Sequence, residues 1–326
     1  MLTETPHIDN WLAFQASRGL ALNTIAAYSR NLQRYLQYLA ISGQNVTNVS
    51  SAAVSKYVRE LLNTRFDGCG ERTEYAFANA TVQQHLTTLR LFYDYLVEEG
   101  VCARNRFQRG YGLATRPLVQ RQQKLPWIPS DEEWCNVLAA ASKEPIRNRV
   151  MLAMSYDAGL RREELCHLEI RDIDPSRRTL RIRAENTKNR RERVLPYSVT
   201  TDSLFAKYLE ARHLVGRQRG ALFLSESSRN RGAPISVWTW SKIVAAIAER
   251  AELPDFTPHT LRHLCLTDLA RADWDIHEIA TFAGHRSIQT TMIYIHLSAR
   301  DLARKLTAAM AAVHHDRLEL ISRLLL

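Results

Sequence analysis

The sequence has few features of secreted, zinc-stabilised or membrane proteins. Its 326 residues include 5 cysteines, an odd number, and no two of them form a CxxC pair. This argues against a disulfide framework and a structural zinc site, and it fits a reducing compartment. No apolar run approaches the roughly 18 residues of a transmembrane helix, and no basic segment followed by an apolar stretch indicates export. We therefore expect a cytoplasmic protein with no membrane partner.

The sequence also lacks the motifs of nucleotide-dependent and metal-dependent enzymes. It contains no Walker phosphate-binding loop, no HExxH zinc helix and no paired carboxylates suited to magnesium. We expect neither a cofactor nor a metal ion.

Acidic residues are fewer than basic ones. The chain has 34 Asp and Glu against 44 Lys and Arg, a net charge of +10, and residues 1–126 and 127–326 each carry about half of the excess. Two basic halves suit a protein that binds a polyanion such as DNA from two sides. Many soluble proteins are basic, so charge alone does not decide the function.

The periodicity of apolar residues predicts a helical first domain over residues 1–112. In "NTIAAYSRNLQRYLQYLA" (23–40) and in "TVQQHLTTLRLFYDYLVEEG" (81–100), apolar residues recur every three or four positions and line one helix face. From there to residue 128 the periodicity stops, and glycine, proline and basic residues predominate. We assign residues 113–128 to a basic linker, either a hinge over a DNA backbone or a solvated tether.

Residues 129–326 predict a second domain of mixed structure. "RTLRIRAENTKNRRERVLPY" (178–197) alternates and turns like a β-hairpin with "ENTKN" at its tip. Helices are expected on both sides of it, including one over 287–297. The apolar tail, about residues 298–326, is expected to be helical. The predicted fold is thus mainly α-helical with a small β-sheet, in two domains.

Two sequence segments place arginine and histidine at helix ends. In "FTPHTLRHLCLTDLA", we expect Thr257 to be an N-cap, with proline at the first helical position. His259 and Arg262 then lie on one face of the first turn. Helix N-termini favour anions. In "AGLRREEL", Arg161 follows a helix-ending glycine, and Glu164 comes one turn later, where it can orient the guanidinium.

Three further residues complete the candidate site. Lys188 lies at the predicted hairpin tip, His285 follows a helix-ending glycine, and Tyr294 lies about two turns into the next predicted helix. Each has an ordinary structural explanation by itself. As a set, they suit metal-free attack on a phosphodiester: arginines hold the non-bridging oxygens, tyrosine supplies the nucleophile, and the imidazoles and lysine move protons.

The order and surroundings of these residues resemble those of the tyrosine recombinases, the lambda-integrase family. The family segments "TGLRxxEL", "GKGNKERxVPL", "HxLRH" and "LGHxxxxTTxxY" are similar to "AGLRREEL", "TKNRRERVLPY", "HTLRH" and "AGHRSIQTTMIY" here. The N-terminal half also resembles the family's core-binding domain. Two departures, the glycine-poor hairpin turn and Ala283 in place of a common leucine, remove no functional group.

The resemblance implies a residue-by-residue mechanism. Tyr294 would attack the scissile phosphate and form a 3′-phosphotyrosyl link, while Arg161, Arg262 and His285 stabilise the transition state. Lys188 would protonate the leaving 5′-oxygen, His259 would assist proton transfer at the tyrosine, and Glu164 would hold the arginine geometry.

The resemblance also implies an assembly. The two domains, the first of them SAM-like, would close as a C-shaped clamp on duplex DNA. Four protomers, with a related second recombinase as a possible partner, would form a synapse by exchanging their tails, about residues 298–326. Such a protein would work on the bacterial nucleoid.

Two other functions remain open on the sequence. A type IB topoisomerase shares the same catalytic residue types and acts as a monomer. A DNA-binding regulator that has lost catalysis would keep the fold and the basic charge. The complete set of catalytic residues and the helical N-terminal half favour a recombinase.

Overall fold

A computed structural model describes residues 5–63, 77–107, 118–120, 125–187, 189–215, 220–297 and 306–307. The chain divides into two compact units, Met1–Lys124 and Leu125–Leu326. In the described residues helices predominate, and the named strands form one three-stranded sheet. The expected fold class, mainly α-helical with a small β-sheet, is confirmed.

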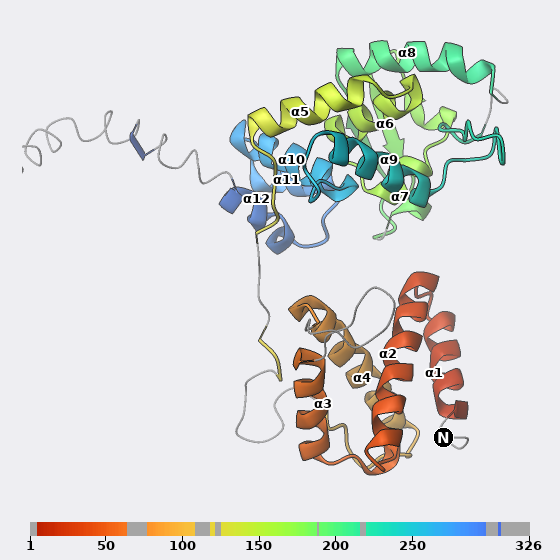
Figure 1. Cartoon of the computed structure of the whole chain (residues 1–326), viewed down its shortest axis with the longest axis vertical. Helices are drawn as coiled ribbons and strands as arrows, with labels where there is room; N and C mark the ends of the chain where they lie inside the picture. The colour runs from red at the N-terminus through yellow and green to blue at the C-terminus, as the bar shows by residue number, and fades with distance from the viewer. Residues whose placement is uncertain are drawn as a thin grey trace, which may run out of the picture. The chain divides into compact units, whose positions relative to one another are not determined.

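The first unit packs its helices around an aromatic core (Figure 1). Trp11 is fully buried, with its ring against those of Tyr28 and Phe92. The hydroxyls of Tyr35 and Tyr93 lie 2.9 Å apart in the same core. The described elements of this unit are α1 (Thr5–Ser17), α2 (Leu22–Ile41), η1 (Val46–Asn48), α3 (Ser51–Asn63) and α4 (Asn79–Glu98).

Part of the expected linker packs on the first unit. Val119 is buried in the core of this unit. The Gln83 side chain donates a hydrogen bond to the Val119 carbonyl at 2.6 Å, and Asn79 donates one to the Gln120 carbonyl at 2.8 Å. Residues 118–120 are therefore held against α4, while 113–117 and 121–124 lie outside the described residues.

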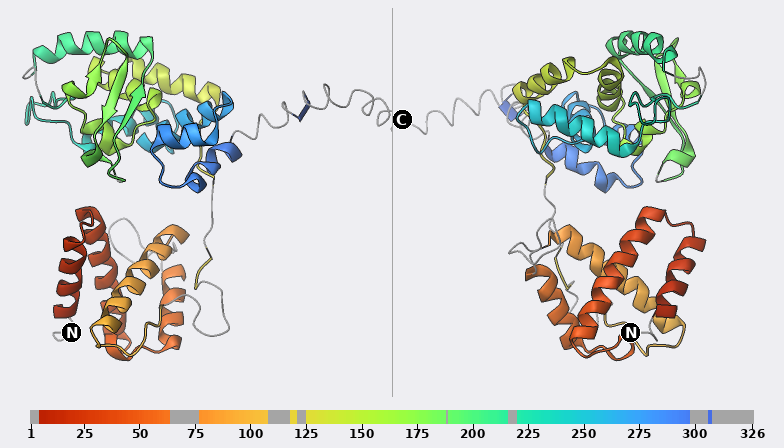
Figure 2. Two further views of the ribbon diagram at one scale, coloured as in Figure 1. Left: turned by 180° about the vertical axis from the view of Figure 1, so that it is seen from behind. Right: turned by 45° about the vertical axis from the view of Figure 1, so that its right-hand side comes forward.

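In the second unit, other elements pack around a central helix, α6 (Ile146–Asp157). Its side chains Val150, Met151 and Met154 are fully buried. This helix contacts α5 and α7, its neighbours along the chain, and also α8, which follows the sheet. In both views of Figure 2 the sheet lies near α8. The helices before the sheet and the long helix after it are α5 (Asp131–Ser142), α6 (Ile146–Asp157), α7 (Arg162–Cys166), η2 (Ile170–Asp172) and α8 (Val199–His213).

The expected β-hairpin is present in this unit. Strands β1 (Ile173–Asp174), β2 (Thr179–Ile182) and β3 (Arg193–Pro196) are antiparallel in the order β1-β2-β3. Leu180 pairs with Leu195, and both are buried, while Arg181 pairs with the exposed Val194. This alternation gives the sheet one face on the core, and η3 (Ala184–Asn186) opens the turn after β2.

The helices that follow begin and end where their capping residues require. The Thr257 side chain accepts a hydrogen bond from the Thr260 backbone at the start of α10, and proline follows Thr257. Gly284, with φ +61°, ends α11 in the left-handed conformation. The remaining elements are α9 (Val237–Arg250), α10 (Pro258–Arg271), α11 (Ile276–Ala283), η4 (Ile288–Thr290) and α12 (Met292–Leu297).

The single helix expected over residues 287–297 is wrong. The segment forms a 3₁₀ turn and then the short helix α12, joined at Thr291. Thr291 is fully buried, and its hydroxyl is 2.9 Å from His285 Nδ1. Around Thr291 the backbone hydrogen bonds join residues three positions apart. The Thr291 N–H donates to the Ile288 carbonyl, and the Tyr294 N–H donates to the Thr291 carbonyl. Tyr294 therefore lies in the first turn of α12 rather than two turns into a helix.

The expected tail, residues 298–326, lies outside the described residues except for 306–307. Within the described parts of the chain, no helix is long and apolar enough to cross a membrane.

We predict that a fragment of residues 1–124 is more stable than one of residues 1–112. The shorter fragment loses the buried Val119 side chain and the two hydrogen bonds to α4, which together contribute about 1–3 kcal/mol. Thermal unfolding followed by circular dichroism measures the difference. The substitution Gln83→Ala should lower the stability of the longer fragment and leave the shorter one unchanged. Equal midpoints for the two fragments would contradict the docking of residues 118–120.

Candidate active site

The second unit brings together six of the seven expected site residues. They come from the start of α7, from α10, from the turn after α11 and from α12. Their contacts include a carboxylate with an arginine, an arginine with an imidazole, and an imidazole ring beside the tyrosine ring. The six residues are Arg161, Glu164, His259, Arg262, His285 and Tyr294.

Glu164 is a buried carboxylate that binds two arginines. It is 1% exposed, and its oxygens accept hydrogen bonds from the Arg161 backbone N–H at 2.9 Å and from the Arg161 guanidinium at 2.7 Å. Arg193 donates two more bonds to the same carboxylate, at 3.1 and 2.6 Å. The expected role of Glu164 as an orienting group for Arg161 therefore has a geometric basis, and Arg193 joins it.

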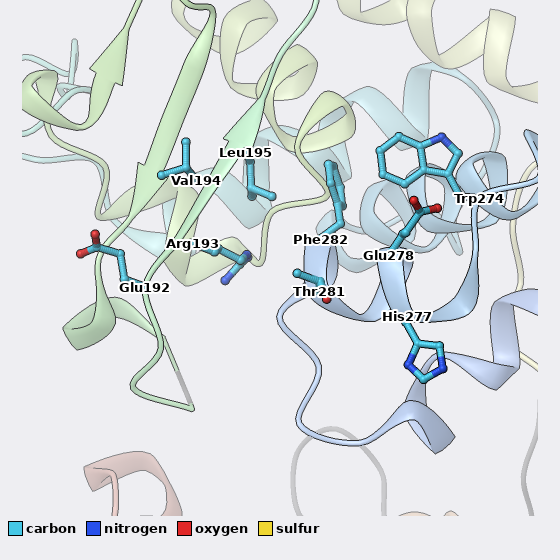
Figure 3. A pocket seen from close by; sticks show the side chains of 9 residues that line it. All are labelled: Glu192, Arg193, Val194, Leu195, Trp274, His277, Glu278, Thr281 and Phe282. Carbon is cyan, nitrogen blue, oxygen red and sulfur yellow. The ribbon is translucent and has the colours of Figure 1, made fainter.

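Arg193 was not among the expected site residues, although it lies within the quoted segment "TKNRRERVLPY". Figure 3 shows its side chain extending from β3 toward α11, in a cleft lined also by Trp274 and Phe282. A Cβ on Gly284 would lie 3.0 Å from an Arg193 guanidinium nitrogen. The glycine thus serves both the left-handed turn and the close approach of this arginine.

Arg262 connects the start of the site to His285. It is 1% exposed and donates hydrogen bonds of 2.6 Å to the Gly159 and Ala283 carbonyls. One of its nitrogens is also 3.1 Å from His285 Nε2. A guanidinium can only donate, so Nε2 accepts, and His285 carries its proton on Nδ1, which donates to the Thr291 hydroxyl.

Tyr294 is almost completely buried between two imidazoles. Its side chain is 2% exposed, and its hydroxyl lies 3.1 Å from Nδ1 of His263. The ring of His285 lies parallel to the Tyr294 ring, with centroids 6.0 Å apart. His259, which was expected to assist the tyrosine, contacts the His263 ring edge to face at 4.4 Å. His263 is the second residue that sequence reasoning missed, and its position in "HTLRH" was the available signal.

The surrounding positive charge and burial change the acidity of these groups. Burial, with the charges of Arg262, Arg161 and Arg193, lowers the pKa of His285 to about 3. Burial, with His259 and Arg262, lowers the pKa of His263 to about 4. Both imidazoles are therefore neutral at pH 7.

Burial and the nearby arginines also shift the pKa values of Glu164, Tyr294 and Arg262. Burial raises the pKa of Glu164, but the hydrogen bonds and charges of Arg193 and Arg161 outweigh it, and the pKa lies below its usual value. Burial raises the pKa of Tyr294, while the charges of Arg262 and Arg161 oppose the shift. Burial, with Arg161, lowers the pKa of Arg262 to about 10, so it remains charged.

Lys188 lies outside the described residues, but its neighbour Asn189 approaches the site. The Asn189 side chain donates a hydrogen bond of 3.1 Å to the Gly284 carbonyl, which also accepts one of 3.3 Å from Arg161. The hairpin tip is therefore joined to the turn that carries His285. Among the described residues, no group of three or more His, Cys, Asp or Glu side chains has an arrangement suited to a metal ion.

Sequence comparisons match both parts of the chain. Residues 130–300 match the phage integrase family, and residues 8–100 match the phage integrase N-terminal SAM-like domain. Tyrosine recombinase XerC of Roseiflexus castenholzii is 29% identical over 288 residues, which cover 86% of this chain and 85% of that protein. A tyrosine recombinase of Thermosipho africanus is 26% identical over 281 residues, covering 86% and 90%.

Solved structures show the same fold. XerH bound to a palindromic difH substrate, in a post-cleavage complex, superposes with a TM-score of 0.69 at 20% identity, covering 91% of this chain and 82% of that one. A lambda integrase dimer bound to a COC′ core site gives 0.66 at 18% identity, covering 89% and 76%.

A SAM-like helical unit followed by a tyrosine, arginine and histidine site defines an enzyme that breaks and rejoins DNA strands. The chain belongs to the phage integrase family and is a tyrosine recombinase. The expected family and the expected activity, site-specific breakage and rejoining of DNA, are confirmed at this level.

We predict that Arg193→Ala lowers the free energy of unfolding of the second unit by about 2–4 kcal/mol, because it leaves the buried Glu164 carboxylate with a single charged partner. The stability of Arg193→Lys should lie between that of the wild type and that of Arg193→Ala, since an ammonium cannot bind the carboxylate through two parallel bonds. Urea unfolding of the full chain measures the loss. Val194→Ala, on the exposed face of the same strand, is the matched control.

The loss should also depend on pH. Because the pKa of Glu164 is lowered in the folded state from its ordinary 4.5, the pair stabilises the fold above that pH and loses its contribution as the pH falls further. The difference between wild type and Arg193→Ala should therefore shrink in acid. A constant difference, or a variant as stable as Val194→Ala, would show that Arg193 does not support Glu164.

Proposed function

We propose that Tyr294 is the nucleophile with which this recombinase cleaves DNA. The observation that carries the proposal is the environment of its hydroxyl: a buried phenol beside Arg262 and Arg161, with neutral imidazoles on both sides. The phenol oxygen forms a bond to phosphorus, and the bond from phosphorus to the 5′-oxygen breaks. The bond energy is retained in the phosphotyrosine, so the rejoining step reverses the same exchange without ATP.

The other expected residues take the roles that their charges support. Arg161 and Arg262 offset the charge that develops on the non-bridging oxygens. His285 contributes by accepting a hydrogen bond from Arg262 and so fixing that guanidinium in the site. Lys188, at the hairpin tip, supplies the proton to the leaving 5′-oxygen. His259 assists proton transfer at the tyrosine through its contact with the His263 ring. Glu164 holds Arg161 in place through the bonds described above. No step in this scheme requires a metal ion or a cofactor.

The DNA partner is supported by solved relatives. XerH is bound to difH DNA and lambda integrase to a COC′ core site, and the net charge of +10 suits the same kind of ligand. We assign DNA binding to both domains, 1–112 and 129–326, with the linker of 113–128 between them as a clamp on the duplex. The site of action is the bacterial cytoplasm, at the nucleoid.

We predict that Tyr294→Phe abolishes formation of a covalent protein–DNA adduct and leaves DNA binding unchanged, because only the hydroxyl is removed. The substrate is a nicked duplex that carries the sequence selected by the wild-type protein from a random duplex library. Adducts are counted on a denaturing gel and affinity by mobility shift. An adduct with the Phe variant would assign the nucleophile to another residue.

The same substrates separate the two rival functions. A type IB topoisomerase relaxes supercoiled DNA as a monomer and does not exchange strands between two sites. A regulator without catalysis binds the selected duplex and forms no adduct. Strand exchange between two selected sites, together with the Tyr294-dependent adduct, excludes both.

We further propose that the tail, about residues 298–326, exchanges between protomers in a tetrameric synapse, with a second copy or a related recombinase as the neighbour. Its support is the apolar spacing of Leu318, Ile321, Leu324 and Leu325, which would give a helix here an apolar face that favours burial against a protein surface. Exchange would couple the position of Tyr294 to assembly, since α12 leads directly into the tail.

Deletion of residues 315–326 should leave binding to a single half-site, and its salt dependence, unchanged, because the phosphate contacts lie elsewhere. It should weaken cooperative binding of the second protomer by at least about tenfold. Mobility-shift titrations on one-site and two-site duplexes measure both quantities. Unchanged cooperativity would mean that the tail packs on its own protomer.

A further inference from the structure

We propose that His263, through Nδ1, accepts the phenolic proton of Tyr294 during strand cleavage and returns it during rejoining. The inference rests on the proposed role of Tyr294 as the nucleophile. It adds His263, the second histidine of "HTLRH", to the proposed catalytic residues. His263 contacts the tyrosine hydroxyl, whereas His259, the first histidine, contacts His263.

The geometry places an imidazole nitrogen beside the reacting atom. The Tyr294 hydroxyl lies 3.1 Å from His263 Nδ1, within the reach required of a general base. The second imidazole near this tyrosine, His285, lies with its ring parallel to the phenol ring at 6.0 Å, and both of its nitrogens already have partners, Arg262 and Thr291. His263 is therefore the imidazole with a nitrogen directed at the phenol oxygen.

The charges around the pair act on both partners. Burial raises the pKa of Tyr294, and the charges of Arg262 and Arg161 oppose that rise, so these arginines favour the phenolate that forms as the oxygen approaches phosphorus. The groups that face His263 are His259 from its own helix, Arg262, Tyr294 from α12 and His285 from the preceding turn. None of these is a carboxylate that would stabilise a lasting imidazolium.

The balance of the step follows from these contacts. The phenol oxygen bonds to phosphorus as its proton passes to Nδ1, and the 5′-oxygen leaves with a proton from the acid on the other side of the site. Because the pKa of His263 is lowered to about 4 by burial and by its positive neighbours, the imidazolium readily gives the proton back.

His259 then has a positioning role. Its ring lies edge to face against that of His263, with centroids 4.4 Å apart, and His259 itself is an exposed residue in the first turn of α10. A ring in this position restrains the rotation of the His263 imidazole without touching the tyrosine. Substitution of His259 should consequently have a smaller effect on the proton-transfer step than substitution of His263.

The test uses the full chain and the nicked duplex selected by the wild-type protein. His263→Asn keeps a hydrogen-bond acceptor close to the position of Nδ1 but cannot take the proton. We expect it to bind DNA normally and to form the covalent adduct about 100- to 1000-fold more slowly, the usual contribution of a general base. His263→Ala should be similarly slow and should be partly rescued by added imidazole. His277→Asn, at an exposed histidine of α11, is the control and should match wild type.

A second substrate separates this role from a purely structural one and from action on the leaving group. Replacement of the scissile 5′-oxygen by sulfur removes the need for an acid, because a thiolate leaves unprotonated. This substitution should not restore His263→Asn. Restoration by sulfur, adduct formation within threefold of wild type, or faster cleavage than wild type would each overturn the proposal, the last because it would make the hydrogen bond a resting restraint.

The same measurements distinguish failure of the proposed nucleophile, Tyr294, from failure of the proposed base, His263. If the wild-type protein forms no Tyr294-dependent adduct, both the nucleophile and its base are wrong. If that adduct forms and His263→Asn forms it equally fast, Tyr294 stands and the base is wrong.

Discussion

The active site depends on a buried carboxylate placed between two arginines. Glu164 is almost wholly removed from water, and it accepts four hydrogen bonds from Arg161 and Arg193. A buried carboxylate without such partners would be strongly destabilising. The arginines satisfy it, and in return their guanidiniums are fixed in position. The Arg161 side chain, which remains 26% exposed, can therefore present a preorganised charge to an incoming phosphate at little further cost in conformational entropy.

This arrangement leaves more positive than negative charge around Tyr294. Arg161, Arg262 and Arg193 together face a single carboxylate, and the excess is what a phosphodiester transition state would neutralise. Burial, reinforced by this excess, lowers the pKa values of His263 and His285, and the excess opposes the effect of burial on the pKa of Tyr294. Without DNA, the imidazoles stay neutral, so the site does not add two further charges to its own repulsion. The site thus carries an excess of positive charge that an anionic substrate would neutralise.

The turn after α11 joins the parts of the site to one another. The Gly284 carbonyl accepts hydrogen bonds from Arg161 and Asn189, and the space left by the absent side chain is filled by Arg193. The next residue, His285, is held between Arg262 and Thr291. The β-hairpin, α7, α10 and the turn therefore meet around two consecutive residues. A displacement of the hairpin would be transmitted through these contacts to Arg161 and to the imidazole beside Tyr294.

The sequence by itself indicated the helices, the hairpin and most of the candidate site residues, because each depends on local signals. Apolar spacing identified α2 and α4, alternation identified β2 and β3, and Thr257 with its proline marked the start of α10. The resemblance to the family supplied the roles of Arg161, Glu164, Arg262 and Tyr294. Only the tertiary structure decided which histidine contacts the tyrosine, because His259 and His263 lie one turn apart on the same helix and both directions are compatible with the sequence. It also decided that Thr291 breaks the expected helix, because its buried hydroxyl contacts His285 in the preceding turn. The pairing of Arg193 with Glu164 likewise came only from the tertiary structure, since the two residues are distant along the chain and such contacts have no periodicity from which they can be read.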